Sequence, residues 1–145
     1  MTAIVPSGEG HLLTARGNVM AFKAVASQTS GDFSLMERTV PAGARTPPPH
    51  RHTGCSEAFF VLAGRATFWL DDAELTGGAG DFLLVPRGVA HTFGNTGDEP
   101  ARLLVLHSPA MDAYFEELHQ LWACGQAPTR EAERELMSRH GMEPA

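Results

Sequence analysis

The feature that most limits the fold of this chain is a series of short apolar stretches between Val19 and Leu106. Each stretch is about 6 to 8 residues long and is bounded by Gly, Pro or Asp, a pattern typical of β-strands joined by turns. The junction Ala63-Gly64-Arg65 predicts a tight hairpin, because Gly64 can adopt a positive φ angle. We therefore expect an all-β domain with strands at Val19–Val25, Phe33–Val40, Glu57–Ala63, Arg65–Asp71, Asp81–Val85, His91–Gly94 and Ala101–His107, and turn structure at Leu75–Gly80.

After Ser108 the sequence changes to a helical pattern. Ser108 suits the N-cap of a helix and Pro109 suits its first turn, so we expect a helix from there to about Ala123. A second, mostly polar helix is expected over residues 130–140. We expect residues 109–145 to be a helical extension of the domain formed by residues 1–108, covering an open face of the sandwich or a partner subunit. Its apolar residues recur at the spacing of one helical face: Met111, Tyr114, Phe115, Leu118, Leu121 and Trp122.

Size and charge exclude several function classes. The chain has 145 residues, the size of one domain, and 17 acidic against 11 basic residues give it a net charge of -6. A pI of about 5.6 argues against nucleic-acid binding, which needs a basic surface. No apolar run approaches the roughly 20 residues of a membrane span, and the first residues lack the pattern of a secretory signal. Two cysteines make no disulfide framework, so we expect a cytoplasmic protein without nucleic-acid or membrane partners.

A cluster of histidines carries the candidate chemistry. His50 and His52 stand two residues apart, so on an extended strand both imidazoles point to the same face. Glu57 follows at the start of the next apolar run, and His91 comes after a Pro-Arg-Gly turn that can aim it inward. Imidazoles and a carboxylate form a mixed nitrogen and oxygen set that suits iron, manganese, nickel, copper or zinc. We expect His50, His52, Glu57 and His91 to hold one metal ion.

These residues resemble the two sequence motifs of the cupins. The first motif is matched by Gly43, His50, His52, Glu57 and Gly64, with one extra residue between Gly43 and His50; the second is matched by Gly80, Pro86, Gly88, His91 and Asn95. Two motifs in order are a far more specific signal than a His-x-His pair alone. The resemblance implies a cupin jelly-roll β-barrel, one divalent metal ion per subunit at its centre, and a homodimer.

His107 adds an open alternative to this ligand set. It ends the last expected strand, which in a jelly roll runs antiparallel beside the strand that begins at Glu57. His107 can then hydrogen-bond Glu57, or it can replace Glu57 as the fourth metal ligand. In the second case Glu57 is free to act as a base. Glu57 and His107 are therefore the candidate catalytic residues, and Glu57 remains the default ligand.

Three functions are compatible with such a site. The expected interior is apolar with few basic groups, which disfavours sugar phosphates and favours a hydrophobic aromatic or polyketide-type molecule. In the preferred hypothesis, which the resemblance to small cupin-type polyketide cyclases supports, the metal is zinc and assists enolate formation and aldol ring closure. In the second, iron, nickel or manganese serves a quercetinase-like dioxygenase. In the third, the protein only binds a hydrophobic ligand.

Overall fold

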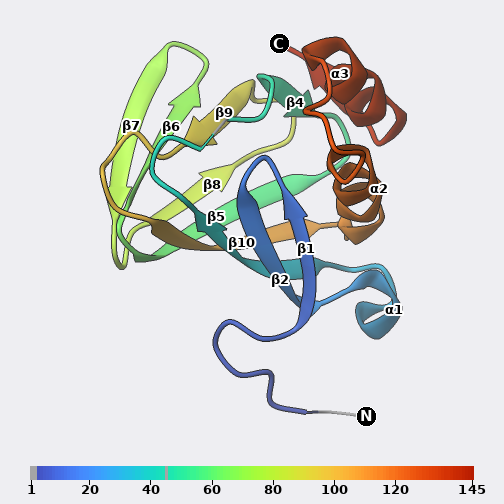
Figure 1. Ribbon diagram of the computed structural model, residues 1–145, viewed down its shortest axis with the longest axis horizontal. Coiled ribbons are helices and arrows are strands. Elements are labelled where there is room, and N and C mark those ends of the chain that lie inside the picture. The colour runs from blue at the N-terminus through green and yellow to red at the C-terminus, as the bar shows by residue number, and fades with distance from the viewer. Residues whose placement is uncertain (1–2, 45) are drawn as a thin grey trace.

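Two antiparallel sheets packed face to face form the body of the protein in a computed structural model that describes residues 3–44 and 46–145 (Figure 1). The six-stranded sheet has the order β1-β2-β3-β10-β5-β8 and the five-stranded sheet the order β11-β4-β9-β6-β7. The strands are β1 (His11–Ala15), β2 (Asn18–Ala24), β3 (Ser34–Val40), β4 (His50–His52), β5 (Ser56–Ala63), β6 (Arg65–Leu70), β7 (Ala73–Gly78), β8 (Phe82–Val85), β9 (His91–Gly94), β10 (Ala101–Ser108) and β11 (Met142–Pro144). The helices are α1 (Ala26–Thr29), α2 (Asp112–Trp122) and α3 (Arg130–Arg139).

The predicted all-β fold is confirmed, and each predicted strand is present to within about two residues at its ends. The hairpin at Gly64 is also as expected, with a φ angle of 74°. A Cβ atom on Gly64 would lie 2.4 Å from the carbonyl oxygen of Pro100, so the turn admits no side chain. The prediction of a turn at Leu75–Gly80 is wrong, since most of that segment belongs to β7, which pairs with β6 along its whole length.

Strand β10 explains why the sheets pack as they do. It lies between β3 and β5, and every second residue from Ala101 to His107 is buried while the intervening residues are half-buried. This alternation directs Leu103, Val105 and His107 into the space between the sheets. The strand opposes β5 so that His107 pairs with Glu57, as the sequence predicts.

The helical extension begins later than the sequence suggests. Ser108 is still part of β10, so it does not cap a helix, and the first helix begins at Asp112 with Met111 in the N-cap position. The backbone N–H of Met111 donates instead to the hydroxyl of Ser34, at 2.9 Å, which ties the start of α2 to the sheet. The second helix has the expected cap, because the Thr129 hydroxyl accepts from the N–H of Ala132.

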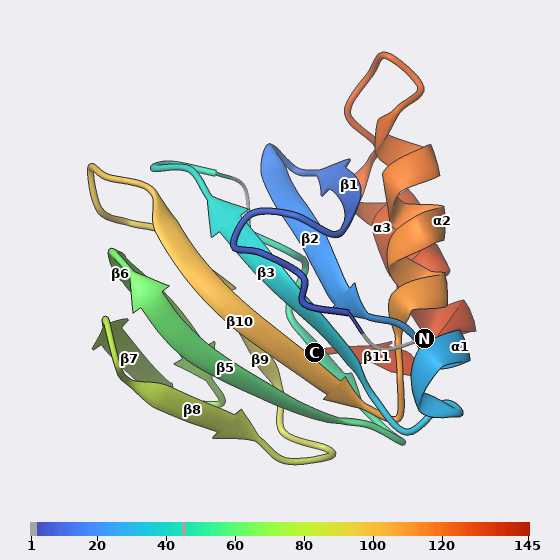
Figure 2. The same cartoon turned by 90° about the horizontal axis from the view of Figure 1, so that it is seen from below.

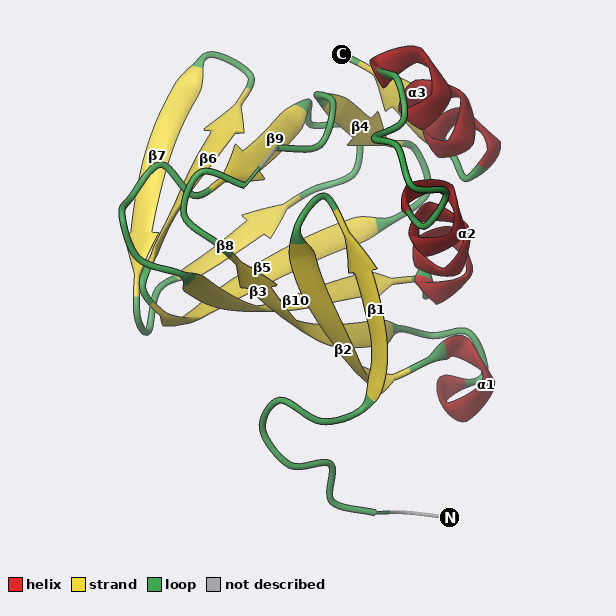
Figure 3. Ribbon diagram, in the orientation of Figure 1, coloured by secondary structure: helices red, strands yellow, loops and turns green. Residues whose placement is uncertain are grey.

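Helices α2 and α3 cover the end of the sandwich next to the β1–β2 hairpin and β4 (Figures 2 and 3). Met111, Phe115 and Leu118 are buried there as predicted, and Trp122 is partly buried. After α3 the chain adds the short strand β11, in which Met142 pairs with His52. Through β11, the extension is therefore paired directly with β4, the strand that carries the His-x-His pair. None of the helices in the described ranges is long and apolar enough to span a membrane.

We expect Leu118→Ala to lower the free energy of unfolding by about 2–5 kcal/mol, because Leu118 is fully buried and its removal leaves a cavity under α2. Urea unfolding followed by circular dichroism measures the change. Leu12→Ala is the matched control, since Leu12 is 55% exposed, and it should change stability by less than about 0.5 kcal/mol. Equal small effects of both substitutions would contradict a structural role for the extension.

The apolar interior agrees only in part with the sequence analysis. Alternation along the predicted strands makes nine apolar residues candidates for the inner face, and six of them are buried: Phe22, Met36, Phe59, Val61, Phe68 and Phe93. Of the other three candidates, Leu70 is partly buried, whereas Phe82 and Leu84 are 64% and 51% exposed and do not face inward. Both lie on the edge strand β8, whose buried residue is Val85. The expected homodimer stays a prediction.

Candidate metal centre

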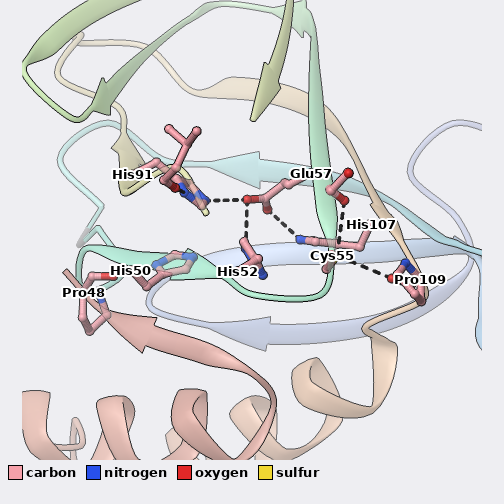
Figure 4. A network of polar contacts seen from close by, with 10 residues as sticks. Pro48, His50, His52, Cys55, Glu57, His91, His107 and Pro109 are labelled. Carbon is pink, nitrogen blue, oxygen red and sulfur yellow. Dashed lines mark hydrogen bonds and ion pairs between the residues drawn. The ribbon is translucent and has the colours of Figure 1, made fainter. Parts of the chain in front are cut away.

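Four candidate ligands from both sheets meet inside the sandwich (Figure 4). His50 and His52 come from β4, His91 from its neighbour β9, and Glu57 from β5 in the opposite sheet. His50 and His91 are direct cross-strand partners. One ligand atom from each of the four residues lies within 4.8 Å of the other three, and all four residues are buried. The structure thus brings together the residues that the sequence selects as metal ligands.

Backbone carbonyls fix the orientation of two imidazoles. The Nδ1 atom of His50 lies 2.8 Å from the carbonyl oxygen of Pro48, and Nδ1 of His91 lies 2.9 Å from that of Val89. A carbonyl oxygen only accepts hydrogen bonds, so Nδ1 carries a proton in both rings, and Nε2 is the atom that each ring directs into the centre. A metal-binding histidine is held in this way in most metal sites.

His52 supplies a third candidate nitrogen, which makes no hydrogen bond to the described residues. This atom, Nε2, is buried. It lies 3.3 Å from Oε1 of Glu57, within ion-pair distance but outside hydrogen-bond geometry. A buried nitrogen without a partner is unfavourable, and a metal ion bound to it would remove that cost.

Glu57 is shared between the histidines. Its Oε1 atom lies 2.7 Å from Nε2 of His91, and its Oε2 atom accepts a hydrogen bond from Nε2 of His107 at 2.6 Å. Burial alone would raise the pKa of Glu57, but His107, with help from His52 and His91, lowers this pKa well below its usual value. The carboxylate is therefore ionised.

The charges of the other site groups follow from the same surroundings. Burial lowers the pKa of His50 to about 3, which keeps this imidazole in the neutral form that binds metals. Burial also acts to lower the pKa of His91, but the nearby Glu57 carboxylate raises it above its ordinary value. A centre that attracts positive charge and offers three nitrogens and one carboxylate oxygen fits a divalent transition metal. The chemistry of the donor set is thus compatible with the metal that the sequence analysis expects.

Two nearby candidates lie outside this ligand set. His107 contacts Oε2 of Glu57, on the side of the carboxylate that does not face His91, so the geometry favours its role as a partner of Glu57. The roles of His107 and Glu57 as catalytic residues remain predictions. Cys55 is buried, and burial raises the pKa of its thiol to about 11, so it stays protonated. Its Sγ atom contacts the carbonyl oxygens of Ser56 and Pro109.

Charged and polar residues that sequence reasoning missed surround the centre. A cavity of about 20 Å³ is lined by Arg16, Arg38, His50, His52, Glu57, His107 and Tyr114, together with five apolar residues. The expectation of an interior with few basic groups is therefore wrong at this end of the sandwich. The sequence contains a signal for this, because Met36 is a candidate for the inner face of its strand and Arg38, two residues later, lies on the same face.

Arg38 is buried deeply next to the candidate ligands. Its Nε atom donates to Oδ1 of Asn18 at 2.7 Å, and its guanidinium carbon lies 4.9 Å above the centre of the Phe93 ring. Burial, followed by repulsion from Arg16, lowers the pKa of Arg38 to about 9. The side chain nevertheless remains positively charged at neutral pH.

The sandwich has a second, apolar pocket away from the helices. It has a volume of about 250 Å³ and is lined mainly by apolar residues of β5, β6, β7 and β8, among them Phe59, Val61 and Phe68. The ring centre of Phe59 lies 5.0 Å from that of Phe68 and 5.2 Å from that of Phe93, which lines the smaller cavity. An aromatic cluster thus separates the apolar pocket from the candidate metal centre.

Comparisons with known proteins agree with this architecture. Over 90 residues the chain is 32% identical to quercetin 2,3-dioxygenase of Bacillus subtilis (strain 168), which covers 62% of this chain and 26% of the dioxygenase. Over 55 residues it is 42% identical to protein SchB of Streptomyces halstedii, which covers 38% of this chain and 40% of SchB. The chain therefore spans less than half the length of each of these relatives.

Solved structures match over a larger part of the fold. A predicted oxalate decarboxylase from Thermotoga maritima has a TM-score of 0.65 with 21% sequence identity, covering 74% of this chain and 99% of the other. Residues 36–107 match the family model of the cupin domain, and this segment contains all the candidate ligands. Because the jelly-roll sheets, the two motifs and the family match coincide, the chain belongs to the cupin superfamily.

Proposed function

We propose that this protein is a metal-dependent enzyme that removes a proton beside a carbonyl group and closes a ring in a polyketide-type substrate. One observation carries the choice of proton chemistry. His107 is only 1% exposed, its Nε2 atom donates to Glu57, and its Nδ1 atom has no hydrogen-bond partner among the described residues. An oriented imidazole with a free basic nitrogen, paired with a carboxylate, is the arrangement of a general base.

The metal would be held by His50, His52, His91 and Oε1 of Glu57. Bound there, a divalent ion supplies Lewis acidity, which polarises a substrate carbonyl and favours loss of the proton on the adjacent carbon. We propose zinc, because neither proton removal nor ring closure needs a change of oxidation state.

The residues of the chain would carry the proton. Nδ1 of His107 accepts it from the carbon next to the carbonyl, and the Glu57 carboxylate stabilises the resulting imidazolium through the bond at 2.6 Å. The enolate carbon then forms a C–C bond to a second carbonyl carbon of the same substrate. The new alkoxide oxygen takes the proton back from His107, so no other reactant is needed.

The surroundings support a reaction that excludes water. All the ligand candidates and His107 are buried, and Phe93 and Phe115 line the same cavity. Enclosure strengthens the electrostatic effect of the charged groups and protects the enolate from protonation by solvent. An aromatic or polyketone chain suits the apolar pocket of about 250 Å³, and it would reach the candidate ligands once the Phe59 and Phe93 rings that lie between them move aside.

A quercetinase-like dioxygenase is the second candidate, and the 32% identity to the Bacillus subtilis quercetin 2,3-dioxygenase favours it. In this alternative the same residues would hold a redox-active metal. The two functions differ in metal identity and in their need for oxygen, so both can be tested on one preparation.

We expect protein purified without a histidine tag to contain about one zinc ion per chain by elemental analysis. Incubated without oxygen, it should cyclise a model poly-β-ketone at the same rate as in air, because the aldol step consumes no oxygen. Iron, nickel or manganese together with oxygen uptake and ring cleavage of a flavonol would favour the dioxygenase. Tight binding without turnover of either substrate would show a binding protein and contradict both enzymatic proposals.

A further inference from the structure

We propose that the cavity beside the metal centre contains an anion subsite in which Arg38 binds a carboxylate group of the substrate. This inference rests on the proposed function and narrows its substrate class to keto acids. The acid group would lie at Arg38 while a carbonyl of the same molecule lies at the candidate ligands. Four observations on the described residues support it.

The first is the missing partner of Arg38. Its Nη2 atom is buried and has no hydrogen-bond partner in the described part of the chain. The residue is 3% exposed and lines the same cavity as His50, His52, Glu57 and His107. Its Nε atom donates to Oδ1 of Asn18, which is neutral, and no carboxylate among the described residues lies within ion-pair distance of the guanidinium. Burying a charge without a counterion costs free energy, so an anion bound to this guanidinium would stabilise it.

The second is a neighbouring arginine in an unfavourable backbone conformation. Arg16 stands at the tip of the β1–β2 hairpin with a φ angle of 53°, a region where glycine or asparagine is preferred. Its side chain is nevertheless buried, with Nε 3.3 Å from Oε2 of Glu133 and Nη2 3.4 Å from the hydroxyl of Tyr114. Glu133 and Tyr114 thus hold a second guanidinium in the wall of the cavity that Arg38 lines.

The third is the charge of the cavity as a whole. Arg16 is neutralised by Glu133, and Glu57 is shared among three histidines and would be a metal ligand. Arg38 has no carboxylate within ion-pair distance and is offset only by the more distant Glu57 charge, and a divalent ion at the ligand set would add two further positive charges. With that ion bound, the cavity groups and the ion together would carry a net positive charge, which favours a negatively charged substrate over a neutral one.

The fourth is the size and chemistry of the space. A volume of about 20 Å³ admits about one water-sized group, such as a carboxylate oxygen, so a keto acid would have to widen the cavity; its wall offers Nη2 of Arg38 and the hydroxyl of Tyr114 as donors. A guanidinium and a hydroxyl suit the planar oxygens of a carboxylate. A phosphate would need more room and more donors than these residues supply.

The test uses formate as the probe and formamide as its uncharged isostere, with zinc-loaded protein and isothermal titration calorimetry. We expect formate to bind at least tenfold more tightly than formamide, and Arg38→Met to weaken formate at least tenfold while zinc content stays the same. Arg102→Met is the matched control, because Arg102 lies on the surface in an ion pair with Glu37, and it should leave formate binding unchanged. Arg38→Lys keeps the positive charge but lacks the planar guanidinium that binds both oxygens of a carboxylate, so it should bind formate with intermediate affinity.

The outcomes separate this inference from the proposed function. If formate binds equally well to wild type and Arg38→Met, or no better than formamide to wild type, the subsite is refuted whatever the metal does. If the chain takes up no zinc, the proposed function fails; formate binding to chelator-treated protein that is lost in Arg38→Met and kept in Arg102→Met would still support the subsite. If Arg38→Met does not fold by circular dichroism, the Arg38→Lys and formamide comparisons decide the question.

Discussion

Replacing His50 or His91 by alanine is expected to reduce the metal content of the purified protein from about one ion per chain to a small fraction. Each residue directs an Nε2 atom into the centre and is held in place by a backbone carbonyl at Nδ1, so each substitution removes a positioned ligand. The fold should survive, because β4 and β9 keep their backbone pairing and the core beneath them is aromatic. Elemental analysis measures the metal, and far-ultraviolet circular dichroism measures the sheet.

His11→Ala is the control for this experiment. His11 is exposed, pairs with Glu116 on α2 and lies outside the ligand set, so its loss should leave metal content unchanged. Full metal occupancy in both His50→Ala and His91→Ala would refute the assignment of these residues as metal ligands. Loss of metal in the His11 control as well would show that the ion binds elsewhere or depends on general stability.

The clustering of the candidate ligands could be predicted from the sequence because its geometry is mostly local. The spacing of His50 and His52 places them on one face of any extended strand. The Pro-Arg-Gly turn ends three residues before His91, so it fixes the direction in which the chain enters that strand. Glu57 begins a long apolar strand, so its position is fixed by the burial of Phe59 and Val61 behind it. The pairing of His107 with Glu57 followed from the strand order that the resemblance implies.

The elements that were missed depend on long-range contacts. Strand β11 has only three residues and exists because it pairs with β4, about 90 positions earlier in the chain. Strand β7 contains Gly77 and Gly78 and is mostly exposed, so neither composition nor alternation distinguishes it from a turn. Helix α2 starts after Ser108 because that residue pairs with Ser56 in the sheet, which outweighs its preference for a helix cap.

The buried charges were missed for a different reason. Reasoning from hydrophobicity assigns arginine to the surface, and it is right for most arginines. Arg38 follows the inward face of β3, and Arg16 reaches the interior from a hairpin tip that cannot be located without knowing that α2 and α3 cover it. The apolar interior expected from the sequence is therefore correct around Phe59 and Phe68 but not beside the ligands.

Substitutions at His107 and Glu57 are expected to separate metal binding from proton transfer. His107→Gln retains an N–H that can donate to Oε2 of Glu57 but has no basic nitrogen, so the carboxylate should stay in place while the proton acceptor is lost. We expect this variant to keep its metal and to lose turnover by about 10² to 10⁴-fold, the usual contribution of a general base. Glu57→Gln removes the charged ligand and should weaken metal binding at least tenfold as well as turnover.

The opposite pattern would reverse the two roles. If His107 is itself the fourth ligand, His107→Gln loses metal, whereas Glu57→Gln keeps metal and loses turnover because the base is then the carboxylate. His119→Gln serves as the control, since His119 lies on α2 and bonds to Thr14 outside the cavity. Metal content and single-turnover rates, measured on the three variants at equal zinc concentration, distinguish the two arrangements. The hydrogen bond from His107 to an oxygen of Glu57 that does not contact His91 is the physical reason to expect the first.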